Sequence, residues 1–151
     1  VVKGCGAKAL SVDYKKYCQE VIDNAQILAD SLINLGYDLV SGGTDTHVVL
    51  VDLTKMNVTG KKAEIVLEKA GITTNKNMVP FDNRSPMITS GIRLGTPAMT
   101  TRGMGKSEMI IIAKLIDRVI KNIDDEKNIL SVRGNVKELC KSFILYKGKI
   151  G

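Results

Sequence analysis

The segment SPMITSGIRLGTP, residues 85–97, carries the pattern on which the fold prediction rests. Interpreted as a strand over residues 88–95, it has two faces, because successive side chains of a strand point to opposite sides. One face is small and polar apart from a single guanidinium and holds Thr89, Gly91, Arg93 and Gly95. The other face holds Ile88, Ser90, Ile92 and Leu94. After the strand, Thr96 and Pro97 predict the start of a helix, with threonine as its cap and proline at the first helical position.

Strands and helices alternate upstream of this segment. Apolar residues at helical spacing after Asp13, which we expect to cap the helix, predict a helix that ends at Gly36. A short strand is predicted over residues 37–40. A longer one over residues 48–53 is apolar on both faces and is therefore expected to be buried. Thr59 is predicted to cap a second helix that ends at Gly71, and residues 72–74 then complete a strand–helix–strand crossover.

Two amphipathic helices are predicted downstream. In the first, apolar side chains recur at Met109, Ile112, Ile116, Val119 and Ile123. In the second, they recur at Ile129, Val132, Val136, Leu139, Cys140 and Phe143. Before these helices, residues 75–105 lose the apolar period, and a segment this irregular within a domain is usually a site or an interface. The prediction is a single α+β domain with a small mixed or antiparallel sheet covered by helices.

The composition narrows the class of protein. The chain has 151 residues and a formal net charge of +6, yet its 22 basic residues are scattered and Trp is absent. We therefore expect a solvated basic surface and no nucleic-acid partner.

The longest apolar run, residues 109–113, is far shorter than the ~20 residues that cross a bilayer, so no membrane segment is expected. Cys5, Cys18 and Cys140 match neither a zinc site nor a disulfide framework, which indicates a reducing, cytoplasmic location.

Several other features of the sequence are weaker candidates for a functional site. The segment GCGAKA, residues 4–9, matches a dinucleotide-binding fingerprint, but no strand precedes it as that motif requires. The segment GKS, residues 105–107, resembles the end of a phosphate-binding loop, but Thr100 stands where the first glycine of that loop is required. His47 is the only histidine, which excludes a His-dependent triad and a multi-histidine metal site. It is either a proton-transfer or stacking group or, as we favour, a strand-edge residue bonded to the preceding turn. Ser11, Ser31 and Ser41 have no activating partner, so no catalytic nucleophile is predicted.

Arg93 is the strongest candidate for ligand binding. Glycines at positions 91 and 95 leave room for a ligand to approach the strand, and a guanidinium suits a bidentate grip on a carboxylate or phosphate. The alternative is an arginine paired with an internal aspartate, or a strand-edge arginine in solvent. Asn75-Lys76-Asn77 is predicted to be a loop before Pro80, where its amides either bond a heterocycle or close an Asx-type turn.

Taken together, these segments resemble the serine hydroxymethyltransferase family. The resemblance rests on SGGTDTH and VLVDL (residues 41–47 and 49–53), GITTNKN (71–77), SPMITSGIRLGTPA (85–98) and TRG (101–103). The segments occur in the family's order and spacing, and the flanking helices fit its small domain. The resemblance implies that residues 1–151 form one C-terminal small domain of a fold-type I pyridoxal-phosphate transferase, whose large domain is absent from this chain.

The resemblance also implies a function and a set of site residues. The family uses pyridoxal 5'-phosphate to interconvert serine and glycine and passes the one-carbon unit to tetrahydrofolate. Arg93 falls on the arginine that binds the substrate carboxylate, and Asn77, Ser85, Pro86 and Met87 fall on positions that contact the folate. The cofactor lysine belongs to the large domain, so this chain alone is expected to be inactive. At full length, a homodimer or a dimer of dimers is expected.

Two other functions stay open at this point. One is the small domain of another pyridoxal-phosphate enzyme, such as an aminotransferase, which also binds carboxylates with a C-terminal arginine. The other is a stand-alone module that binds small anions or RNA without catalysis, which the basic charge favours weakly.

Overall fold

A four-stranded antiparallel sheet forms the base of the structure, with strand order β1-β2-β4-β3. The computed structural model describes residue 9 and residues 11–144. Its strands are β1 (Asp38–Leu39), β2 (Val48–Asp52), β3 (Asn75–Asn77) and β4 (Gly91–Gly95). β2 and β3 both pair with β4 in the antiparallel sense, so they run parallel to each other with β4 between them. The predicted crossover is therefore present, but its second strand is residues 75–77 rather than 72–74.

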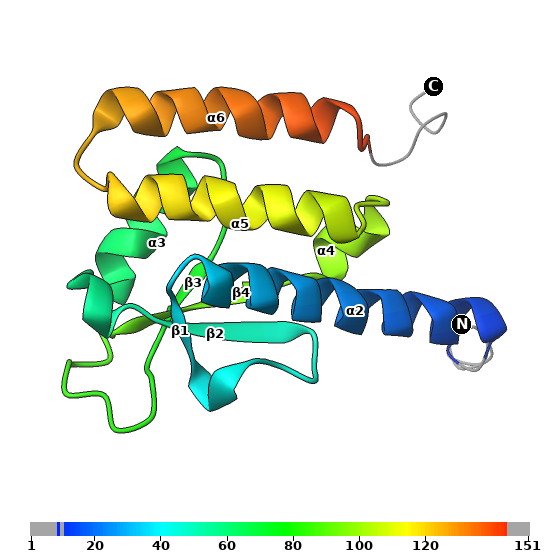
Figure 1. Ribbon diagram of the computed structural model, residues 1–151, viewed down its shortest axis with the longest axis horizontal. Coiled ribbons are helices and arrows are strands. Elements are labelled where there is room, and N and C mark those ends of the chain that lie inside the picture. The colour runs from blue at the N-terminus through cyan, green and yellow to red at the C-terminus, as the bar shows by residue number, and fades with distance from the viewer. Residues whose placement is uncertain (1–8, 10, 145–151) are drawn as a thin grey trace.

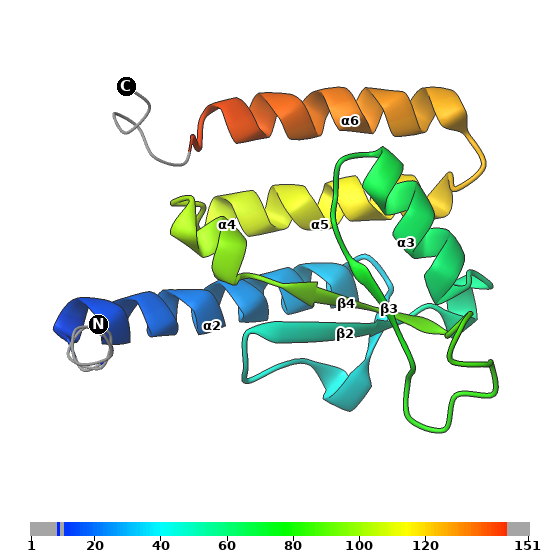
Figure 2. The same cartoon turned by 180° about the vertical axis from the view of Figure 1, so that it is seen from behind.

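The α-helices lie on one side of this sheet, as Figures 1 and 2 show. They are α2 (Val12–Asn34), α3 (Gly60–Lys69), α4 (Pro97–Thr101), α5 (Lys106–Lys121) and α6 (Glu126–Lys141), with short 3-10 helices η1 (Val40–Gly42) and η2 (Thr54–Met56). α2 and α3 contact the strands, α5 packs against α2, and α6 packs on α5 as the outermost layer. We call the sheet face that none of the described α-helices covers the open face. The fold is the expected α+β class.

The core lies between the sheet and the helices. Its fully buried side chains come from both layers and include Val49, Val51, Ile92, Leu32, Met109 and Ile116. Val48 and Leu50, which alternate with the buried valines of β2, are only half-buried. The prediction that this strand is buried on both faces is therefore wrong, because helices cover one face only.

The helix ends agree with the sequence at most positions. Gly36 and Gly71 follow α2 and α3 with φ angles of 93° and 83°, a conformation that glycine adopts without strain. Thr59 caps α3, as predicted, by accepting a backbone hydrogen bond from the first turn. Ser11 caps α2 in place of Asp13, because the serine hydroxyl accepts the first-turn hydrogen bond at 3.2 Å. Asp13 lies inside the first turn, where its negative charge complements the helix dipole.

β4 is shorter than predicted and begins at Gly91. Thr89 has a φ of 57°, in the left-handed region, so the strand cannot extend back to residue 88. Pro97 occupies the first turn of α4 as predicted. The Thr96 hydroxyl, however, does not cap that helix; it donates to the Val21 carbonyl oxygen at 2.8 Å and ties the end of β4 to α2.

The two C-terminal helices are amphipathic, as predicted. α5 buries Met109, Ile116 and Val119, while Ile123 follows the end of the helix. α6 is the more exposed of the two and buries only Ile129 and Val132. Within the described part of the chain, no helix is both long enough and apolar enough to cross a membrane.

Candidate functional site

Arg93 lies in the middle of an interior strand. It pairs with Leu50 on β2 and with Asn75 on β3, so neighbouring strands flank it on both sides. Ile92 and Leu94 are buried against the helices, whereas Arg93 is exposed. Alternation along the strand therefore directs the guanidinium to the open face.

The Arg93 side chain lines a cavity of about 320 Å³ at the end of the sheet where β4 stops and β2 begins. The lining residues are His47, Val48, Thr73, Thr74, Asn75, Arg93, Leu94 and Gly95, none of which is acidic. The guanidinium forms no hydrogen bond or ion pair with any described residue, so pairing with an internal aspartate, the alternative considered above, does not occur among them. An unpaired guanidinium presents two parallel N–H donors, which suit a carboxylate or phosphate.

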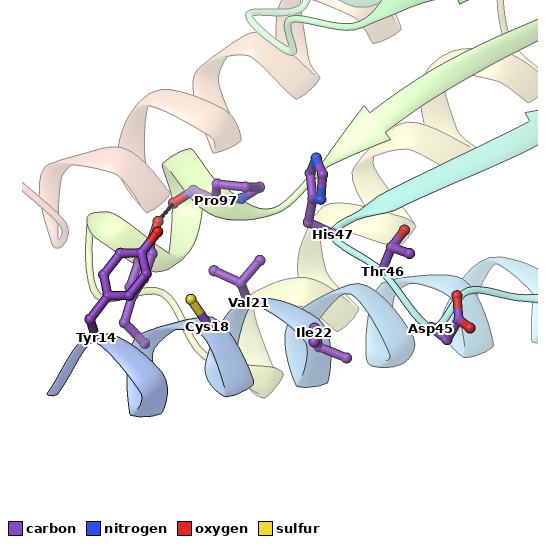
Figure 3. Close-up of a pocket in the computed structure, with 9 residues that line it drawn as sticks. Tyr14, Cys18, Val21, Ile22, Asp45, Thr46, His47 and Pro97 are labelled. Carbon is purple, nitrogen blue, oxygen red and sulfur yellow. Dashed lines mark hydrogen bonds between the residues drawn. The ribbon is translucent and has the colours of Figure 1, made fainter. Parts of the chain in front are cut away.

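His47 lines this cavity and also a second one of about 430 Å³ beside α2. Figure 3 shows Tyr14 and His47 on opposite sides of the second cavity, with Cys18 and Val21 between them. The His47 ring bonds to no described residue, so the predicted bond to the preceding turn is wrong. Its backbone carbonyl instead accepts a hydrogen bond from the Thr96 N–H at 3.3 Å, which fixes His47 beside the end of β4.

The segment Asn75-Lys76-Asn77 is strand β3 and not the predicted loop. Lys76 faces α3, where its ammonium lies 3.6 Å from a Glu64 carboxylate oxygen and its backbone N–H donates to the same side chain. Asn75 and Asn77 therefore point to the opposite side, onto the open face. The Asn77 amide donates to the Met78 carbonyl oxygen at 2.7 Å. The two asparagines thus differ, because only one of them has its amide engaged within the described chain.

The predicted folate contacts Ser85, Pro86 and Met87 lie in the loop between β3 and β4, residues 78–90. All three are exposed, and Met87 has 71% of its surface accessible. The end of the loop is fixed to the start of α3, because the Gly60 N–H donates to the Thr89 carbonyl oxygen at 3.0 Å. The loop is therefore anchored at this end, while Ser85, Pro86 and Met87 are exposed to solvent.

Asp82 organises this loop from within. Its carboxylate accepts hydrogen bonds from the Ser90 hydroxyl at 2.6 Å, the Ser90 N–H at 2.8 Å, the Arg84 N–H at 2.9 Å and the Val79 N–H at 3.3 Å. Burial alone would raise the pKa of Asp82, but these hydrogen bonds outweigh burial and lower the pKa to about 2. The ionised carboxylate therefore holds both ends of the loop together at neutral pH.

The structure separates the predicted site residues into two groups. Asn77 pairs with Gly91 at the beginning of β4, whereas Arg93 lies two residues further along, roughly 7 Å away. The cavity around Arg93 extends toward Gly95, at the other end of the strand from the loop. The open face thus places Arg93 and an exposed loop at neighbouring but distinct positions.

The residues around Arg93 fit a carboxylate and do not fit pyridoxal phosphate. Among the described residues, no lysine lines the cavity to offer an ε-amine to the cofactor aldehyde, and no acidic side chain there can face the pyridine nitrogen. No cluster of His, Cys, Asp or Glu side chains able to hold a metal occurs in residues 11–144. Cys18 and Cys140 are free thiols, and Cys5 lies outside the described residues.

The GKS pattern at residues 105–107 begins α5 without forming a phosphate loop. The Gly105 N–H donates to the Glu108 carboxylate at 2.7 Å, and this hydrogen bond lowers the pKa of Glu108. A carboxylate therefore occupies the helix N-terminus that a phosphate would need. The GCGAKA pattern falls almost entirely outside the described residues.

The sequence pattern does not predict the role of Asp82 in the loop or the position of Asn75 beside Arg93. Asp82 belongs to a polar loop in which its side chain bonds the backbone two residues on, an Asx-type signal that is visible in the sequence. Asn75 has no comparable signal, because asparagine is depleted in strands and only the pairing register places it opposite Arg93.

Comparison with protein families agrees with this geometry. The family model described as serine hydroxymethyltransferase matches residues 4–116, which is more than half of the 151-residue chain. The matched region contains all four strands, the cavity around Arg93 and the loop between β3 and β4. An antiparallel sheet with helices on one side is consistent with a domain of such an enzyme. The chain therefore belongs to the serine hydroxymethyltransferase family.

Proposed function

We propose that this chain is the small C-terminal domain of a pyridoxal-phosphate-dependent enzyme that interconverts serine and glycine, with tetrahydrofolate as the one-carbon acceptor. Membership of the family supports the reaction class. The observation that carries the proposal for this domain is the exposed guanidinium of Arg93, which has no partner and no acidic neighbour in its cavity among the described residues.

Arg93 binds the α-carboxylate of serine or glycine through two parallel N–H···O hydrogen bonds. An interior strand with neighbours on both sides supports this role, because it limits the movement of the arginine backbone. A carboxylate held at two oxygens leaves the amino acid few orientations, so the bond to be broken is presented in one geometry. The contribution of Arg93 is binding and orientation rather than proton transfer.

Asn77, Ser85, Pro86 and Met87 contact the folate. The exposure of the loop residues supports this assignment, since a thioether such as that of Met87 packs well against an aromatic ring. The Asp82 hydrogen bonds also support it, because they hold the loop in one conformation before a ligand arrives and so reduce the entropy lost on binding.

The cofactor is assigned to a separate, large domain that carries the cofactor lysine, since the residues around Arg93 do not fit it. Pyridoxal phosphate supplies an electron sink when bound. The assembled enzyme is a homodimer or a dimer of dimers in the cytoplasm, without a nucleic-acid or membrane partner.

The full-length protein that contains this chain provides the test. Purified with pyridoxal phosphate, it should convert serine to glycine at a rate that depends on tetrahydrofolate. Amino-group transfer to a 2-oxo acid without folate dependence would replace this function with that of an aminotransferase. Salt-sensitive RNA binding without any turnover of serine would replace it with that of a nucleic-acid module.

A further inference from the structure

Asn75 is the residue closest to Arg93 in the pairing of β3 with β4. The two residues lie directly opposite each other, and residues paired in this way have Cβ atoms about 4.5–5.5 Å apart on the same face. Both are exposed on the open face, and both line the cavity of about 320 Å³. A ligand in this cavity can therefore contact both side chains.

The side-chain hydrogen-bonding groups of Asn75 and Arg93 are available to a ligand. Neither the Asn75 amide nor the Arg93 guanidinium bonds to any described residue. On the other flank, Arg93 is paired with Leu50, which offers no polar side-chain group. Of the two residues paired directly with Arg93, Asn75 is thus the one with a polar side chain.

We propose that Asn75 is a second substrate-binding residue, whose amide N–H donates a hydrogen bond to the same carboxylate that Arg93 binds. This inference rests on the proposed function of Arg93. An ionised carboxylate has about four lone-pair sites, of which a bidentate guanidinium occupies two. The Asn75 amide fills a third site and fixes the rotation of the carboxylate about its bond to Cα.

Asn77 does not share this role. It lies two residues further along β3, and its amide already donates to the Met78 carbonyl oxygen. The two asparagines of one short strand are therefore expected to act on different ligands, Asn75 on the amino acid and Asn77 on the folate.

Steady-state kinetics of the full-length enzyme test the inference. Asn75→Ala should raise the KM for serine about three- to tenfold, the effect of losing one hydrogen bond of ordinary net strength, and leave the KM for tetrahydrofolate unchanged. Asn75→Asp should raise the serine KM further, because it sets a second negative charge beside the substrate carboxylate. Asn135→Ala, the same substitution at an exposed position on α6, should leave both values at the wild-type level.

A binding measurement separates recognition from a structural effect. Glycine should raise the thermal unfolding midpoint of wild type more than that of Asn75→Ala, whereas glycinamide, which lacks the carboxylate, should shift both proteins equally. Equal loss of both shifts in Asn75→Ala would assign Asn75 a structural role and overturn the inference.

The kinetic outcomes also separate this inference from the proposed function. If Arg93→Ala raises the serine KM while both Asn75 variants keep the wild-type value, the role of Asn75 is overturned and that of Arg93 stands. If Arg93→Ala itself leaves the serine KM unchanged, the proposed carboxylate site fails together with the role of Asn75.

Discussion

Asn75 and Arg93 face each other across β3 and β4, and strand alternation directs both side chains to the sheet face that none of the described α-helices covers (Figure 1). On the opposite face of the same strand, Ile92 and Leu94 are buried in the core. β4 therefore contributes to the candidate site on one side and to the core on the other. Substitutions on β4 are expected to separate these two roles.

Gly91→Ala should lower the free energy of unfolding by about 1–3 kcal/mol. A Cβ at this position would lie 2.8 Å from both the Val51 carbonyl oxygen and the Val79 Cγ1 atom, so the strands or the loop must shift. Urea unfolding measures the effect. Gly134→Ala is the control: no atom lies within 4 Å of its Cβ, and it should raise the stability of α6 by up to about 1 kcal/mol. Wild-type stability of Gly91→Ala would contradict the close strand packing.

Asp82→Asn should destabilise the protein at neutral pH but not in acid. The folded pKa of Asp82 is about 2, below the ~3.9 of an unfolded aspartate. A lowered folded pKa stabilises the fold above about pH 4, and this contribution is lost as the pH falls toward about 2. The difference in free energy of unfolding between wild type and Asp82→Asn, measured by urea unfolding at successive pH values, should therefore shrink across this interval. A difference independent of pH would show that the carboxylate charge is not what holds the loop.

The fold is largely predictable where burial is one-sided and the apolar spacing is regular. α5 and α6 follow from their apolar positions, and the ends of α2 and α3 follow from Gly36 and Gly71. β3 is not predictable in this way, because asparagine and lysine disfavour strands and only pairing with β4 makes residues 75–77 extended. Tertiary contacts override local propensity there.

The candidate site shows the same contrast between features that are local in the sequence and features that depend on tertiary contacts. Arg93 is identifiable from strand alternation and its flanking glycines, both of which are local features of the sequence. The amide of Asn75 is visible as a candidate in the sequence, but its position opposite Arg93 is not, because that position depends on the register between two separate strands. Ser11 replaces Asp13 as the cap of α2 for a simpler reason: both residue types cap helices, and the choice depends on where the backbone turns.

The purified 151-residue chain, supplied with pyridoxal phosphate and tetrahydrofolate, should not convert serine to glycine. The cavity around Arg93 contains no lysine, so the amino acid would be bound without a group that holds the cofactor next to it. The full-length enzyme under identical conditions is the positive control. Turnover by the isolated chain at a rate comparable with that control would contradict the assignment of the cofactor to a separate domain.

The central claim is that Arg93 binds the substrate carboxylate, and the serine kcat/KM of full-length Arg93 variants tests it most directly. Arg93→Ala should lower this value about 10- to 150-fold, the effect of losing hydrogen bonds to a charged group. Arg93→Lys should recover only part of the loss, since an ammonium lacks the two-pronged geometry of a guanidinium. Arg133→Ala, at an exposed position on α6, should match wild type. Near-wild-type kcat/KM in both Arg93 variants would contradict the account and remove Arg93 from the site.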